Sequence, residues 1–293
     1  MKRNILLLFT FFACITVQGQ TPVRLVDLRS EHLDRPIGLD NPVPRLSWRM
    51  EDGRQGAVQT SWRIVVDEDS LNVVNGCGRM WDSGKNDSRN QLVAYAGKKL
   101  QPFTRYYWKV ICSDMEYKET ASPVSYFETG MMGMQHWQGA WIGDGKDIHY
   151  GPAPYFRKEF KTGKKVKSAR AYIAAAGLYE LYINGEKIGD HCLAPLYTRF
   201  DRRNLYVAYD VTSQLQNGDN AIGVLLGNGW YNHQSKAVWD FDRAPWRNRP
   251  TFCLDLRITY TDGSVETIPT DLSWRTASGA ITFNSIYLSL IHI

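Results

Sequence analysis

The stretch Leu178-Tyr-Glu-Leu-Tyr-Ile-Asn-Gly-Glu-Lys-Ile188 decides the fold class of this chain. Six residues of strand character run into Asn184 and Gly185, the two residue types that best tolerate the positive φ angles of a two-residue turn. Lys187 and Ile188 then begin a return strand. The stretch therefore predicts a β-hairpin.

The same pattern continues on both sides of this hairpin, as short alternating runs separated by Gly, Pro, Asn and Asp. No longer stretch has a helical period, and this spacing is typical of β-sandwiches. From about Trp137 onward we expect a jelly-roll-like sandwich. Its further predicted strands are 155–160, 169–176, 204–211, 220–226, 251–260 and 264–268.

An earlier unit, residues 23–130, has its own strands at 45–49, 61–66 and 105–112. In the strand 105–112, alternate residues form one apolar face and one more polar, solvent-facing face, as in a half-buried strand. The order of its motifs resembles a fibronectin type III domain. Trp48 matches the early core tryptophan of that fold, and Leu100 and Tyr106 match its late corner. The alternative is another seven-stranded sandwich, and neither gives this unit a catalytic role.

Composition excludes several classes of protein. The net charge of +5 is modest and its charges are mixed along the chain, so no basic patch of a nucleic-acid binder is present. The chain has 10 Trp and 16 Tyr, which suit sheet cores and also the apolar faces of sugars. Cys77, Cys112, Cys192 and Cys253 have no metal-ligand spacing, and we expect most of them to be buried free thiols.

The first residues read as an export signal. Lys2 and Arg3 precede an apolar run, Ile5 to Ala13, and small and polar residues follow it. The run is shorter than the roughly 20 residues that span a bilayer, and no later segment looks membrane-spanning. We expect cleavage near Gly19 and a secreted or periplasmic protein, with lipid anchoring through Cys14 as the alternative.

Four blocks in the second unit carry a more specific resemblance: Ala174–Asp190, Leu193–Thr212, Gly218–Tyr231 and Thr259–Trp274. In content, order and spacing they are similar to the N-terminal β-sandwich of bacterial α-L-rhamnosidases of the glycoside hydrolase family 78 type. The resemblance implies that an intact parent hydrolyses terminal α-L-rhamnosyl residues of plant glycans with inversion. It also implies that a further sandwich and an (α/α)6 barrel, absent from this sequence, hold the two catalytic carboxylates.

No catalytic residue is therefore expected in this chain, and we expect it to be inactive by itself. The acidic side chains of the second unit have structural explanations in strand ends and turns. They are Asp201, Asp210, Asp240, Asp242 and Asp271.

A long loop after Gly227 is the candidate contact site. It combines aromatic side chains with arginines, which can meet sugar rings and hydroxyls or can pack against the missing barrel of the parent. Docking on the barrel is the interpretation we favour, and rhamnose-containing glycans are the alternative partner. The candidate residues are Asn228, Trp230, Tyr231, Trp239, Arg243, Trp246 and Arg247.

Some domains of this family type bind rhamnose through calcium, using acidic and amide side chains near residues 197–201. Arg199 stands where the family usually has Asp, and an arginine cannot ligate a cation that takes oxygen ligands. Asp201 and Asn228 remain the weak calcium candidates, and no cofactor is otherwise expected.

The expected organisation is a signal peptide (1–20), a type III-like domain (21–131), an incomplete rhamnosidase-type sandwich (132–287) and an aberrant tail (288–293). The tail departs abruptly from the family pattern after Tyr287, which we interpret as a truncation. A stand-alone rhamnose- or glycan-binding module is the second hypothesis. A β-galactosidase-like enzyme is the third, and the four blocks count against it.

Overall fold

The computed structural model describes residues 23–234, 236, 239–286 and 289–292, so the expected signal peptide and Cys14 lie outside the described residues. Its sheets are antiparallel, which confirms the predicted all-β fold. The chain divides into two compact units. The first contains Arg45–Lys98, Tyr106–Tyr126 and the described residues before Arg35, and the second contains Arg35–Pro44, Lys99–Arg105 and the chain from Phe127 onward.

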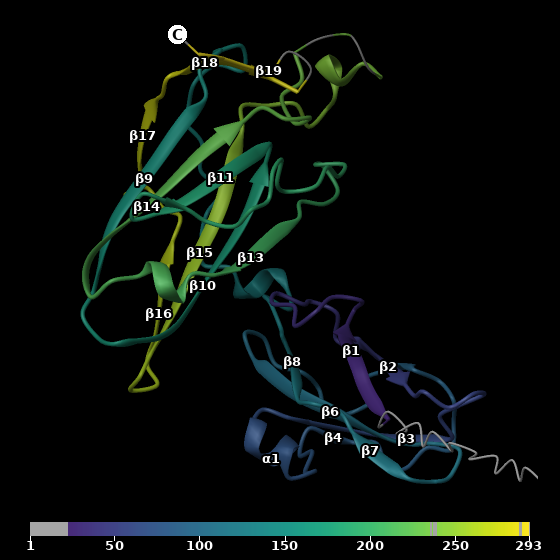
Figure 1. The fold of residues 1–293 in the computed structure, drawn as a ribbon. Coiled ribbons are helices and arrows are strands. Elements are labelled where there is room, and N and C mark those ends of the chain that lie inside the picture. The colour runs from purple at the N-terminus through teal and green to yellow at the C-terminus, as the bar shows by residue number, and fades with distance from the viewer. Residues whose placement is uncertain (1–22, 235, 237–238, 287–288, 293) are drawn as a thin grey trace, which may run out of the picture. The chain divides into compact units, whose positions relative to one another are not determined.

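The first unit is a sandwich of two sheets (Figure 1). One sheet has the order β1-β2-β5, and the other has the order β4-β3-β6-β7 with β8 also on β6. The fourth strand, β4, lies in the second sheet beside β3, and the two sheets confirm the predicted β-sandwich of this unit. The strands are β1 (Arg24–Ser30), β2 (Arg45–Glu51), β3 (Ser61–Asp67), β4 (Trp81–Asp82), β5 (Leu92–Ala94), β6 (Arg105–Ser113), β7 (Glu119–Ala121) and β8 (Ser125–Glu128).

Trp48 lies in the core of this sandwich, as the sequence predicted. Its ring meets that of Trp62 edge-on with 6.1 Å between centroids, and its indole N–H donates to Gln59 Oε1 at 2.8 Å. Tyr106 and Leu100 are also buried. One short helix, α1 (Ser70–Val74), was not predicted, because five residues are too few to show a helical period.

The second unit is also a two-layered sandwich (Figure 1). One sheet has the order β13-β10-β15-β16 and the other β12-β11-β14-β9-β17, with β18 and β19 paired beside them. These elements are β9 (Pro154–Thr162), β10 (Val166–Ala176), β11 (Leu178–Ile183), β12 (Glu186–Lys187), β13 (Tyr206–Asp210), β14 (Gly218–Gly227), β15 (Thr251–Tyr260), β16 (Val265–Pro269), β17 (Arg275–Ser278), β18 (Ile281–Ser285) and β19 (Ser289–His292), with the 3-10 turns η1 (Met134–His136), η2 (Thr212–Gln214) and η3 (Phe241–Arg243).

The hairpin that decided the fold class is present as β11 and β12. Ile183 pairs with Glu186, and the turn residues Asn184 and Gly185 have φ angles of 50° and 86°. Between the two sheets lies an apolar core in which Phe252 contacts Phe156 at 5.0 Å and Trp274 at 5.4 Å between ring centroids. Burial of such side chains contributes about 1.5–3 kcal/mol each.

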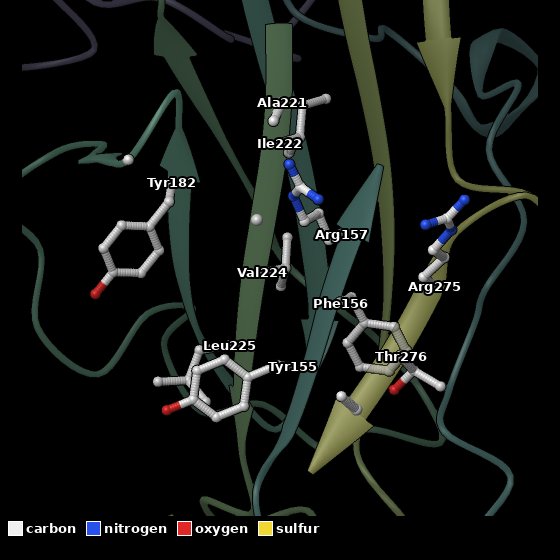
Figure 2. Close-up of a pocket in the computed structure, with 13 residues that line it drawn as sticks. Tyr155, Phe156, Arg157, Tyr182, Ala221, Ile222, Val224, Leu225, Arg275 and Thr276 are labelled. Atoms are coloured by element: carbon white, nitrogen blue, oxygen red, sulfur yellow. The ribbon is translucent and has the colours of Figure 1, made fainter. Parts of the chain in front are cut away.

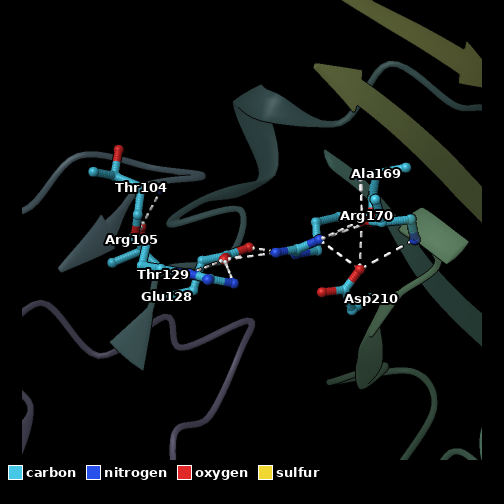
Figure 3. A network of polar contacts seen from close by, with 8 residues as sticks. Thr104, Arg105, Glu128, Thr129, Ala169, Arg170 and Asp210 are labelled. Atoms are coloured by element: carbon cyan, nitrogen blue, oxygen red, sulfur yellow. Dashed lines mark hydrogen bonds and ion pairs between the residues drawn. The ribbon is translucent and has the colours of Figure 1, made fainter. Parts of the chain in front are cut away.

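A buried ion-pair network ties the chain at Glu128 to β10 inside the second unit (Figure 3). Arg170 donates to both carboxylate oxygens of Glu128, at 2.7 and 3.0 Å. Arg105 donates to the same carboxylate at 3.1 Å, and Asp210 pairs with Arg170 at 2.8 Å. Because a buried carboxylate is costly without partners, this network fixes the path of the residues around Glu128.

The cysteine prediction was half right. All four cysteines of the described residues are free, but Cys77 and Cys192 are exposed, and only Cys112 and Cys253 are buried. Burial raises the pKa of Cys253 to about 11 and that of Cys112 to about 12. No helix among the described residues is long and apolar enough to cross a membrane. The predicted domain boundaries, including the tail from 288, stay predictions.

Candidate functional site

The long loop after β14 folds back on itself around Phe241, which the sequence analysis did not select. Phe241 lies in the short turn η3, with its ring centroid 5.7 Å from Trp230 and 5.9 Å from Trp239 and from Trp246. The structure thus brings the three predicted tryptophans around one phenylalanine. We call this group, with the rings that pack on it, the aromatic loop cluster: Tyr197, Phe200, Trp230, Tyr231, His233, Trp239, Phe241 and Trp246.

A second loop, between β12 and β13, supplies the other side of the cluster. Tyr197 lies 5.9 Å from Phe241 and 6.3 Å from Trp230, and Phe200 lies 5.2 Å from Tyr231, all between ring centroids. Tyr197 and Phe200 belong to the segment considered for calcium, and their part in this packing was missed. Contact between loops 30 or more residues apart leaves no local sequence signal.

Asn228 is an internal anchor. It is buried, and its side-chain oxygen accepts from Asn232 Nδ2 at 3.2 Å. Its side-chain amide donates to the Asn284 carbonyl at 3.0 Å, and its backbone N–H donates to Asn284 Oδ1 at 2.6 Å. The start of the loop is therefore tied to β18 through amide side chains.

Asp201 is occupied as well. Both oxygens of its carboxylate accept from Arg199, at 2.9 and 3.1 Å, and Arg199 is the residue that departs from the family pattern. No group of three or more His, Cys, Asp or Glu able to hold a metal occurs within the described ranges. Since Asn228 is also bonded internally, these two side chains do not fit a calcium site in this conformation.

The arginines of the loop have different surroundings. Arg247 donates to Asn232 Oδ1 at 3.1 Å and to the Asp242 carbonyl at 3.0 Å, so it holds the loop together from inside. Arg243 is exposed on η3. Arg249, outside the predicted set, is buried and forms an ion pair of 2.8 Å with Asp144. It closes the far end of the loop.

Burial sets the titration behaviour of the cluster. His233 is almost fully buried, and this burial lowers its pKa, while nearby Asp242 raises it and Arg247 lowers it by smaller amounts. Burial likewise raises the pKa of Tyr231. Trp239 is the most exposed member of the cluster, at 83%, and Tyr197 is also exposed. The cluster is therefore a packed, largely uncharged base that carries one exposed indole.

Three of the acidic residues named from the sequence, Asp201, Asp210 and Asp271, are held by basic side chains. Asp210 pairs with Arg170, and Asp271 accepts from Lys158 at 2.8 Å, which lowers the pKa of Asp271 to about 2. Asp255 was not considered from the sequence. It is buried, burial raises its pKa, and its two oxygens accept from the backbone N–H groups of Gln138 and Gly139. This carboxylate therefore tethers the start of the second unit to β15.

The fold is thus two consecutive β-sandwiches, in which Asp210, Asp255 and Asp271 serve as structural anchors. Both sandwiches match known protein domains. Residues 25–133 match the Rha78A-like, N-terminal immunoglobulin domain, and residues 164–291 match the α-L-rhamnosidase N-terminal domain. The chain is thus similar, domain by domain, to the N-terminal portion of α-L-rhamnosidases, which confirms the resemblance inferred from its four sequence blocks.

Relatives and solved structures agree with these domain matches. An α-L-rhamnosidase of Formosa agariphila is 32% identical over 97% of this chain and 33% of its own length. An α-L-rhamnosidase of Alteromonas sp. (strain LOR) is 30% identical over 86% of the chain and 28% of its own. The structure of the α-L-rhamnosidase from Dictyoglumus thermophilum superimposes with a TM-score of 0.84 at 37% identity, over 92% of this chain and 31% of that one. The chain therefore spans about a third of the length of these relatives.

Proposed function

We propose that this chain is the N-terminal part of an exported enzyme that hydrolyses terminal α-L-rhamnosyl residues of plant glycans with inversion. The observation that carries the proposal is the match of both units to α-L-rhamnosidase domains, in order along the chain. Inversion requires a general acid and a general base about 6.5–9.5 Å apart, with water between the base and the sugar. We propose that both carboxylates lie outside this chain.

The test of this activity uses the protein encoded by the reading frame when it is extended past residue 287. That protein is given p-nitrophenyl α-L-rhamnopyranoside, and proton NMR follows the first anomer of rhamnose released. We expect β-L-rhamnose as the first product. Initial release of the α-anomer, or a frame that encodes no further sandwich and helical barrel, would overturn this proposal.

We propose that the aromatic loop cluster docks on the catalytic part of the parent rather than on sugar. Apart from Tyr197 and Trp239, its rings are buried or half-buried, and most of its ring contacts are edge-on. A sugar-binding ring instead needs an open face. Trp239 supplies an exposed apolar side chain, and Leu196 on the neighbouring loop, 77% exposed, supplies another. Exposed apolar side chains gathered on a rigid base are typical of protein–protein contact.

Two variants of the extended protein separate docking from folding. Trp239→Ala removes an exposed side chain and is expected to leave the melting temperature of the 293-residue chain unchanged, but to lower that of the extended protein. Leu272→Ala removes a fully exposed apolar side chain from the turn between β16 and β17 and is the matched control. Equal effects of the two variants on the extended protein would count against docking.

A stand-alone glycan-binding module is the second candidate function. Its support is the outer face of the five-stranded sheet in the second unit, which includes no residue of the aromatic loop cluster.

A further inference from the structure

The outer face of the five-stranded sheet in the second unit carries a hollow of about 580 Å³ (Figure 2). Its walls come from β9, β11, β14 and β17, and it includes no residue of the aromatic loop cluster. A hollow of this size lies within the range that small-molecule sites occupy.

The strand register places one row of side chains across this hollow. Tyr182 on β11 pairs with Gly223 on β14, Gly223 pairs with Arg157 on β9, and Arg157 pairs with Arg275 on β17. Tyr155 lies on the same face of β9, two residues before Arg157. Tyr182 and Arg157 therefore flank a position that has no side chain, with Tyr155 on the same strand as Arg157 and Arg275 beyond it on β17 (Figure 2).

Gly223 is not required by the fold. Its φ angle is not in the left-handed range, and an added Cβ would find its nearest neighbour, Tyr182 Cβ, at an ordinary 3.7 Å. A glycine inside a strand costs about 0.5–1 kcal/mol relative to alanine, so its presence there needs a reason. Close approach of a ligand is one such reason, since only glycine leaves the sheet surface bare.

Both tyrosine rings are held in place before any ligand arrives. The Tyr182 hydroxyl donates to Glu180 at 2.6 Å, and Lys187 holds the other oxygen of that carboxylate. The Tyr155 ring lies against Gly279, where an added Cβ would fall 1.5 Å from the ring. Rings that are already ordered lose little conformational entropy on binding.

The charges of the hollow favour an anion. Arg157 and Arg275 are direct cross-strand partners, and like charges placed opposite each other destabilise a sheet. Arg157 pairs with Glu159, but both side chains are about 60% exposed, so this ion pair is weak and easily exchanged. In the described part of the chain Arg275 has no ion pair. An anion between the two guanidinium groups would relieve their repulsion.

We propose that this face binds an acidic oligosaccharide, with sugar rings on Tyr155 and Tyr182 and over Gly223, and an anionic substituent at Arg157 and Arg275. The apolar C–H face of a pyranose matches a tyrosine ring, and a guanidinium binds a carboxylate or a sulfate ester equally well in geometry. The proposal goes beyond rhamnoside hydrolysis, because binding at this face needs no catalytic group.

Calorimetry on residues 21–293 of the chain tests the proposal at low salt. Three probes of one length are compared: a galacturonic acid trisaccharide, a galactose trisaccharide bearing sulfate esters, and unmodified galactotriose. We expect at least one charged probe to bind about fivefold or more tightly than the neutral one, and this preference to shrink in high salt. The two charged probes distinguish a carboxylate from a sulfate as the anionic group.

Variants tie the binding to the hollow. Gly223→Val fills its floor, and we expect it to abolish binding while the chain stays folded, because valine suits a strand and the space for a Cβ is open. Arg275→Ala is expected to weaken charged probes about fivefold and to leave the neutral probe unchanged. The matched control for Arg275→Ala is Arg89→Ala, and the matched control for Tyr155→Ala is Tyr117→Ala. Arg89 and Tyr117 are both exposed and lie in the first unit.

Several results would overturn the proposal. These are no binding of any probe, equal affinity for the charged and neutral probes, or undiminished binding in a folded Gly223→Val variant. Each is independent of whether the extended protein hydrolyses rhamnosides, so failure here leaves the proposed enzymatic function to its own test.

Discussion

Asn228 shows how one amide side chain can be read in two ways. In the sequence it stands between glycines ahead of two aromatic residues, which suggests an oxygen ligand or a contact to sugar. In the structure its amide is bonded on both sides, to Asn232 and to Asn284. The difference arises from Asn284, 56 residues further along, whose partnership no local pattern could indicate.

Replacement of Asn228 by alanine therefore tests an anchor. We expect Asn228→Ala to lower the free energy of unfolding by about 2–3 kcal/mol, because it leaves buried partners of the amide unpaired. Urea denaturation measures the change. Asn75→Ala, at an exposed helix end in the first unit, is the control and should stay within about 0.5 kcal/mol of the unchanged chain. Equal effects would show that the bonds of Asn228 contribute nothing.

His233 makes the aromatic loop cluster sensitive to acid. Burial holds its folded pKa below the value of about 6.5 expected in the unfolded chain. As the pH falls below about 6.5, the histidine of the unfolded chain takes up a proton before that of the folded chain does. The free energy of unfolding therefore decreases with falling pH, and this decrease ends once the pH is below the pKa of His233 in the folded chain. We predict a larger fall in melting temperature between pH 7.5 and 5.5 for the unchanged chain than for His233→Gln. His191→Gln, at an exposed histidine, should behave like the unchanged chain.

At the scale of elements, the hairpin was predictable because its chemistry is local. Asn184 and Gly185 favour positive φ angles wherever they occur together, and the alternating strands on either side need only their own residues. The outer hollow was not predictable. It depends on the pairing of Arg157 with Arg275, and the register of strands so far apart in sequence is set by the whole sheet.

The hairpin turn gives a prediction at this scale. Gly185→Ala forces a Cβ into the left-handed region, at a φ of 86°, and is expected to cost about 1–2 kcal/mol of stability. Gly163→Ala is the matched control, because Gly163 also has open space around it but lacks a positive φ. Chemical denaturation compares the two. A smaller cost at Gly185 than at Gly163 would contradict the role assigned to the turn.

At the scale of the whole molecule, the polar network around Glu128 joins segments that are far apart in the sequence (Figure 3). We expect Glu128→Ala to lower the free energy of unfolding by about 3–5 kcal/mol, because it leaves the buried guanidinium of Arg170 without its main partner. The double variant Glu128→Leu with Arg170→Met should recover most of this loss, since it leaves no buried charge at Arg170. Calorimetric melting of the three proteins measures both effects. No recovery in the double variant would show that the residues act through packing rather than charge.

The fold class and the resemblance to α-L-rhamnosidase domains were accessible from the sequence because hairpin chemistry, strand alternation and ordered motif blocks are carried by residues close together. The arrangement of the site was less accessible. Phe241 had no signal of its own, and its position at the centre of the aromatic loop cluster follows from two loops meeting across the end of the sandwich.

The central proposal is that this chain supplies the non-catalytic part of an α-L-rhamnosidase. The most direct measurement is the hydrolysis of p-nitrophenyl α-L-rhamnopyranoside by residues 21–293 of the chain, beside the protein encoded by the extended reading frame. We predict no release of p-nitrophenol above buffer from the chain alone and steady turnover by the extended protein. Turnover by the chain alone, lost when Asp255 is replaced by asparagine, would contradict the claim and place an active site within these two sandwiches.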